Sequence, residues 1–214
     1  MIRLDRASLS VRAGTERRAV LDDASFDFGP GIWHLSAAPA GDARLLVGLI
    51  AGHYPLDAGS IRRDGLCSWP LSQAAALGPG LTGLDLIDLV CSLHDLERRV
   101  TFDFFRDLIE APDLLGQRFD RWPQAAQRQF AHTAFLAPEF DAYLLDVSPV
   151  LPDGAFYRRW RALFGARIAG KVAIIAAAEH RAARRDFPGH RVRLAAGALR
   201  RETETAALPL LAAE

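Results

Sequence analysis

The chain has 214 residues, of which half are hydrophobic, and its 26 Lys and Arg side chains balance its 26 Asp and Glu side chains. A chain of this length fits a single domain over residues 1–214 and carries enough apolar residues for a substantial core. The zero net charge excludes the broadly basic surface that is typical of nucleic-acid-binding proteins, so we expect no nucleic-acid partner.

The apolar runs and the two cysteines indicate the compartment. The longest apolar runs, at residues 45–51 and 172–178, are too short to cross a bilayer. The amino terminus has no apolar segment of the kind found in secretory signals, and Cys67 and Cys91 fit free thiols in a reducing compartment. We therefore expect a cytoplasmic chain without a membrane span.

The amino-terminal part of the chain is expected to contain antiparallel strands. Alternating apolar residues and a turn-forming Asp64-Gly65 pair are the signals. Strands are expected at residues 2–10 and 19–28, and a hairpin at residues 60–69.

The middle and the end of the chain differ in their predicted secondary structure. Residues 82–138 predict a helical region, with Thr82 as the cap of its first helix. After it, buried strands alternate with helices, which predicts a parallel sheet with right-handed crossovers. Helices are expected at residues 84–93, 102–109, 114–119, 123–136, 155–164, 181–185 and 206–213, and strands at 142–146, 172–177 and 190–194.

Residues 31–52 have the layout of a phosphate-binding P-loop. A short apolar strand at 31–35 leads into a loop of small residues and then a helix that Gly52 would end. A working P-loop needs glycines for close backbone approach, a Lys for the outer phosphates and a hydroxyl for magnesium. These positions are occupied by Gly41, Asp42, Ala43, Arg44 and Leu45, and the only Lys in the chain is Lys171. The layout is therefore present without its chemistry.

Two residues of this loop have alternative interpretations. Asp42 is expected at or near the helix N-cap, where its carboxylate would cap the free N–H groups and repel a nucleotide. Arg44 could replace the missing Lys, because guanidinium suits phosphate. The alternative for Arg44 is a solvated side chain that pairs with Asp42.

Asp146 ends a buried strand and is the candidate metal ligand. It could hold a magnesium ion through water. The alternative is a strand-end carboxylate that caps a neighbouring loop.

Several short segments occur in an order that resembles one known family. The chain resembles the ATP-binding subunits of ABC transporters and, more narrowly, those of capsular polysaccharide and O-antigen export. The resemblance covers nearly the whole chain and implies an α/β P-loop NTPase fold: a three-layer core with an antiparallel β subdomain and an inserted helical subdomain at about 82–138. The segments that carry it are VLDDASF at 20–26, LIAG at 49–52, DAGSI at 57–61, SWPL at 68–71, LTG at 81–83 and YLLD at 143–146.

The departures from the family pattern fall on its chemistry. The resemblance implies an aromatic that stacks on adenine, a first P-loop glycine, a glutamine near the metal, a signature Ser-Ser-Gly, a catalytic Glu and a switch His. Only the Walker B Asp, at Asp146, and the Asp of the D-loop, at Asp153, are kept. The other positions are occupied by Val11, Ala37, a shifted Gln73, Pro123-Gln124-Ala125, Val147, and Glu179 or His180.

Three hypotheses follow. The first is a non-catalytic homologue, a pseudo-ATPase linked to polysaccharide export. It would pair with an ABC permease or a catalytic ATP-binding subunit as a homodimer or heterodimer, on the inner membrane through that partner. The second is a transporter subunit that retains weak ATP and magnesium binding through Arg44 and Asp146. The third is a binding module in which the vacated cleft takes another small ligand. No cofactor is expected under the first.

Overall fold

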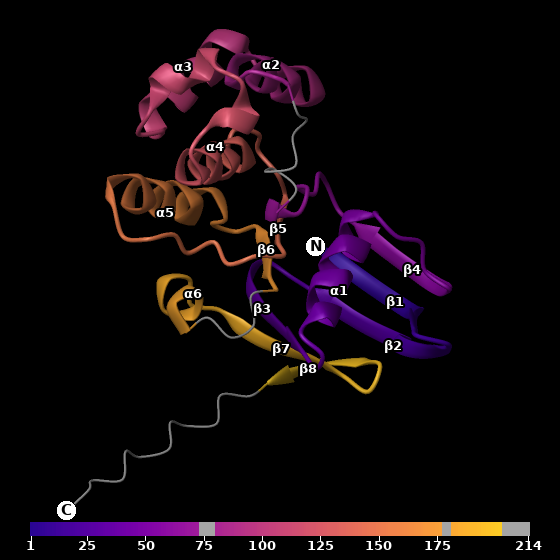
Figure 1. The fold of residues 1–214 in the computed structure, drawn as a ribbon. Helices are drawn as coiled ribbons and strands as arrows, with labels where there is room; N and C mark the ends of the chain where they lie inside the picture. The colour runs from indigo at the N-terminus through magenta and orange to yellow at the C-terminus, as the bar shows by residue number, and fades with distance from the viewer. Residues whose placement is uncertain (73–79, 177–180, 203–214) are drawn as a thin grey trace, which may run out of the picture.

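The computed structural model describes residues 1–72, 80–176 and 181–202, which form two sheets and a group of helices (Figure 1). The smaller sheet is antiparallel, in the order β2-β1-β4. Its strands are β1 (Ile2–Ala13), β2 (Glu16–Phe28) and β4 (Ala58–Arg63). The two predicted amino-terminal strands are present, and each extends three residues further into the turn between them.

The hairpin predicted at residues 60–69 is wrong. β4 pairs with β1, and residues 66–69 turn instead toward the larger sheet, where Cys67 bridges Ala142 in parallel. Gly65 does lie in a turn, with φ +86°, and the carboxylate of Asp141 accepts the Leu66 N–H at 2.8 Å. A contact 75 residues away therefore replaces the local strand pairing.

The larger sheet has the order β5-β6-β3-β7-β8, and all its strands but the last are parallel. The sequence predicted the four parallel strands, but not the edge strand β8. That strand carries two Arg side chains and has weak alternation. The strands are β3 (Gly31–Ala37), β5 (Ala142–Leu145), β6 (Val172–Ile175), β7 (His190–Ala195) and β8 (Ala198–Glu202).

Helices cover both faces of this sheet, and helices α2 to α4 stand at one end of it (Figure 1). The predicted helix at 114–119 is two short 3₁₀ turns, η2 and η3; the predicted helix at 206–213 lies outside the described residues. The helices are α1 (Gly41–Ala51), α2 (Gly83–His94), α3 (Arg98–Leu108), η2 (Pro112–Gly116), η3 (Phe119–Arg121), α4 (Gln124–Leu136), α5 (Ala155–Arg167) and α6 (Arg181–Asp186).

Helix ends follow the predicted capping chemistry. The Thr82 side chain accepts the Asp85 N–H while the Asp85 carboxylate accepts the Thr82 N–H, which is a capping box at the start of α2. Gly52 ends α1 in the left-handed conformation.

The core divides into two clusters, one on each face of the parallel sheet. Successive residues of one strand alternate between them: Leu144 packs with α1 and the antiparallel sheet, whereas Tyr143 and Leu145 pack with α4 and α5. In the described residues, no helix is long and apolar enough to cross a membrane.

One buried histidine ties α4 to α5. His132 is 5% exposed, and its ring Nδ1–H donates to the Arg128 carbonyl at 2.9 Å. Its own carbonyl accepts the Trp160 indole N–H at 2.8 Å. Burial lowers the pKa of His132 from 6.5 to about 4, because the charged imidazolium would lose its water.

The free energy of unfolding is predicted to fall as the pH drops from about 6.5 to about 4. In that window the unfolded chain takes up a proton at residue 132 that the folded chain does not, at a cost of roughly 3 kcal/mol at most. Urea unfolding of the wild type and of His132→Gln at several pH values measures this effect. The difference between the two proteins should vary across this window, and a constant difference would show that His132 titrates normally in the fold.

Candidate functional site

The P-loop-like segment keeps its strand-loop-helix layout, and two N–H groups at the start of its helix are hydrogen-bonded within the segment. Helix α1 begins after Ala40, which has no side-chain cap. The N–H of Asp42 donates to the Pro39 carbonyl at 3.1 Å, and that of Ala43 donates to the Ala40 carbonyl at 3.3 Å. The expectation that Asp42 caps this helix is therefore wrong, since it is the second residue of α1 and its carboxylate points elsewhere.

The carboxylate of Asp42 is bound by Arg18 of β2. Two parallel hydrogen bonds of 2.6 and 2.7 Å join the guanidinium to both carboxylate oxygens. Asp42 is 7% exposed, so its charge needs a partner, and a bidentate guanidinium supplies one with good geometry. The predicted pairing of Arg44 with Asp42 is replaced by this contact across 24 residues.

Arg18 lies close to the position at which the family resemblance places the adenine-stacking residue. Arg18 lies opposite Val11 in the β1–β2 register, and Val11 is where the family resemblance places the adenine-stacking aromatic. The ion pair thus joins the adenine side of the expected nucleotide groove to the first turn of α1.

Of the remaining candidate residues, Ala43 is buried, and the others line a cavity of about 370 Å³. Arg44 is exposed there, and Asp146 faces the same space. The Asp146 carboxylate accepts the Ser72 N–H at 2.9 Å and also the Ser72 hydroxyl. It caps this loop, as the alternative interpretation of Asp146 held. The lining residues are Gly41, Arg44, Leu45, Gly48, His53, Tyr54, Pro70, Ser72 and Asp146.

A magnesium ion held with a nucleotide takes one or two carboxylates, a hydroxyl and phosphate oxygens. Asp146 could supply one carboxylate, but Arg44 and Leu45 occupy the hydroxyl positions and Ala43 the Lys position. Across the described ranges, no group of three His, Cys, Asp or Glu side chains converges. These residues do not fit a magnesium-nucleotide site.

The other family positions are scattered. Pro123 is the N-cap of α4, and Gln124 and Ala125 are exposed at its start. Asp153 is exposed and lies 3.4 Å from Arg158, so it forms a surface ion pair. Gln73, Glu179 and His180 lie outside the described residues.

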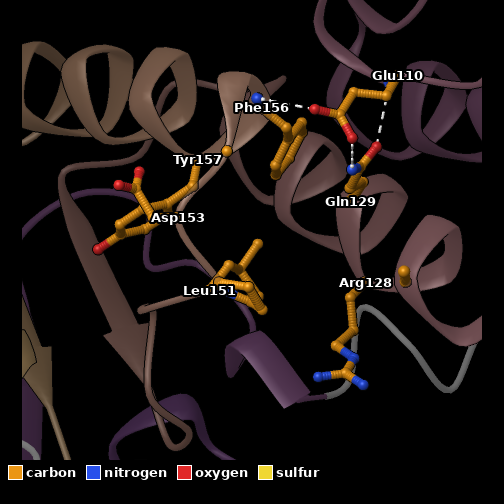
Figure 2. A pocket seen from close by; sticks show the side chains of 10 residues that line it. Glu110, Arg128, Gln129, Leu151, Asp153, Phe156 and Tyr157 are labelled. Atoms are coloured by element: carbon orange, nitrogen blue, oxygen red, sulfur yellow. Dashed lines mark hydrogen bonds between the residues drawn. The ribbon is translucent and has the colours of Figure 1, made fainter.

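A second cavity, of about 270 Å³, lies between the start of α4 and the segment that leads into α5 (Figure 2). Its upper wall in Figure 2 is Glu110, whose carboxylate accepts the Phe156 N–H at 3.2 Å and the Gln129 amide at 2.7 Å. Leu151 and Tyr157 form its apolar side, and Arg128 stands at its opposite end. Sequence reasoning did not single out Glu110, because nothing in its local spacing links it to residues 129 and 156.

Comparisons with known proteins find relatives that are similar to the chain in sequence. No family model matches it. It is 28% identical to the ATP-binding protein BexA of Haemophilus influenzae over 158 residues, 73% of this chain and 72% of that protein. It is 31% identical to the capsule polysaccharide export ATP-binding protein CtrD of Neisseria meningitidis over 141 residues, 65% of each chain. A third relative is the polysialic acid transport ATP-binding protein KpsT of Escherichia coli, 27% identical over 174 residues, 77% of this chain and 76% of that one.

Solved structures agree on the fold. A dimeric post-hydrolysis state of the ATP-binding cassette MJ0796 with ADP and Pi superposes with a TM-score of 0.74 at 14% identity, over 95% of this chain and 98% of that one. The ATP-binding subunit of an ABC transporter superposes with a TM-score of 0.73 at 15% identity, over 95% and 90%. The expected P-loop NTPase fold with an antiparallel subdomain is confirmed. The chain thus has the fold of ABC ATPase cassettes, and its sequence is similar to those of ATP-binding proteins, one of them named for capsule polysaccharide export and one for polysialic acid transport.

Proposed function

We propose that this chain is a non-catalytic ABC subunit, a pseudo-ATPase that works in polysaccharide export by pairing with a partner protein. The Arg18–Asp42 ion pair carries this proposal. It fixes a carboxylate in the first turn of α1, the turn at which a P-loop protein receives phosphate. The pair would have to break, and a nearly buried carboxylate would have to lose its partner, before a phosphate could approach.

Hydrolysis also lacks its reactive groups. Phosphoryl transfer depends on positioned cations and an oriented water. Val147 follows the Walker B position, and Ala43 and Arg44 stand where a Lys and a hydroxyl are needed. The separate loss of the Lys, the hydroxyl and the catalytic Glu supports a chain that keeps the fold as a scaffold. Any ATP hydrolysis that transport requires would then be carried out by a partner subunit.

The transport context rests on the relatives. Two of them carry capsule polysaccharide export or polysialic acid transport in their names. We place this chain in such a system, on the inner membrane through a permease or in a dimer with a catalytic ATP-binding subunit.

An exposed apolar surface on the helical end suits a partner. Leu93 is 67% exposed and Leu89, one turn before it on α2, is 37% exposed; Val100 at the start of α3 is 66% exposed. These residues lie on two consecutive helices, and large exposed apolar side chains that form a contiguous patch mark interaction surfaces. We propose that this surface, defined by Leu89, Leu93 and Val100, contacts the permease.

Weak nucleotide binding is the second candidate. The cavity that Arg44 and Asp146 share favours it, because an exposed guanidinium with no ion pair in the described residues could meet a phosphate there. The same cavity could also take another small anion. If Arg44→Ala loses the binding of a nucleotide or of another small anion, that ligand binds in this cavity.

Wild-type protein is predicted to give no saturable heat when titrated with Mg-ATP by calorimetry at millimolar concentrations. Asp42→Gly is predicted to gain measurable binding, because it removes the carboxylate, frees Arg18 and allows closer backbone approach. Asp42→Asn is the matched control, since it removes the charge but keeps the side-chain shape. Saturable binding by the wild type would reject the pseudo-ATPase proposal and favour the second candidate.

Co-expression with the permease tests the partner. Leu93→Asp is predicted to lower recovery of the complex by about tenfold, because it puts a charge into the buried contact. Leu163→Asp, on the exposed side of α5 at 39% exposure, is the matched control and should leave recovery unchanged. Equal recovery of all three proteins would show that this surface is not the contact.

A further inference from the structure

The hairpin of β7 and β8 presents different side chains on its two faces. Val192, Leu194 and Leu199 lie in the buried cluster on one face of the parallel sheet. Because side chains alternate along a strand, Arg193 and Arg200 lie on the other face. The register places these two residues directly opposite each other, and both side chains are exposed. Two positive charges therefore stand side by side on the open face of the hairpin.

The Arg193–Arg200 pair has no compensating carboxylate within residues 1–72, 80–176 and 181–202. Neither guanidinium has a hydrogen bond or an ion pair in these ranges. The neighbouring row on the same face is balanced, because Arg191 lies opposite Glu202 and the two side chains approach to 3.3 Å. Like charges directly opposite each other destabilise a sheet, so the uncompensated pair works against the fold.

A second pair of opposed arginines in the molecule does have a carboxylate beside it. Arg12 lies opposite Arg17 in the β1–β2 register, and the Asp57 carboxylate lies 3.4 Å from the Arg17 guanidinium. In that hairpin the fold itself supplies an anion. The β7–β8 pair breaks the same local rule with no compensating contact among the described residues, which is expected of residues that serve binding and not stability.

Helix α6 adds a further guanidinium on this side of the sheet. Phe187, just after α6, packs in the core cluster that contains α4 and α5, so α6 lies on the face opposite to Val192. Burial chiefly lowers the pKa of His34, and the nearby charges of Arg184 and Arg191 lower it further, so both arginines lie close to His34. The arginine face is defined by Arg184, Arg191, Arg193 and Arg200.

We propose that the arginine face binds an acidic segment of a protein partner. A guanidinium presents a planar fork that matches a carboxylate in two parallel hydrogen bonds, so Asp and Glu side chains would neutralise the opposed pair. A lipid surface suits the face less well, because the described residues of α6, β7 and β8 include no exposed large apolar side chain that could insert beside the charges. The zero net charge of the chain gives no wide positive field for nucleic acid.

The arginine face lies apart from the surface proposed for the permease. Strands β7 and β8 form the edge of the parallel sheet opposite to β5, whereas helices α2–α4 stand near the β5 edge (Figure 1). A partner bound at the arginine face would leave α2 and α3 open. The inference thus goes beyond the proposed function and does not depend on nucleotide binding or on the permease contact.

Fluorescence anisotropy of a labelled peptide in which Glu alternates with Ser tests the proposal on the full chain. The wild type is predicted to bind this peptide saturably at low salt and more weakly as salt rises. Arg193→Ala combined with Arg200→Ala is predicted to lower the affinity by about tenfold, because two exposed charge contacts are lost. Arg12→Ala combined with Arg62→Ala is the matched control. It also removes two exposed arginines that have no ion pair in the described ranges, and it should keep the wild-type affinity.

Thermal unfolding of the same variants separates binding from a structural role. The Arg193→Ala, Arg200→Ala variant is predicted to melt at or above the wild-type temperature, because it removes the repulsion between like charges. A lower melting temperature would show that the two arginines stabilise the fold and would overturn the proposal. It would also be overturned by absent binding in the wild type, by equal weakening in both double variants, or by tighter binding to anionic vesicles or to an oligonucleotide of the same charge.

Discussion

The ion pair between Arg18 and Asp42 is the constraint on which the interpretation of this molecule depends. A carboxylate that is 7% exposed carries a large desolvation cost unless a cation with matching geometry meets it. Arg18 does so with two short hydrogen bonds, and the pair lies between the antiparallel sheet and the first turn of α1. Removing either partner therefore affects the packing of the antiparallel sheet against α1.

Most of the fold was accessible from the sequence because its signals are local. Thr82 caps α2 as predicted, with Asp85 three residues later completing a capping box, and Gly52 ends α1 as its position indicated. The buried parallel strands are short unbroken apolar runs. Such patterns specify an element without knowledge of its neighbours.

The candidate site could be predicted from the sequence only in part, because its contacts join residues that are far apart in the chain. The sequence located the missing P-loop groups, but the partner of Asp42 lies 24 residues away on another strand. The Ser72 contact of Asp146 spans 74 residues, and the Glu110 contact with Phe156 spans 46. The false hairpin at 60–69 has the same origin, because an Asp-Gly turn was a valid local signal that a distant pairing overrode.

A crystal structure of the wild-type chain grown in excess Mg-ATP would test the central claim most directly. We predict that the Arg18 guanidinium remains on Asp42 and that no phosphate lies at the first turn of α1. A nucleotide with its phosphates at that turn, and Asp42 turned away from Arg18, would contradict the account.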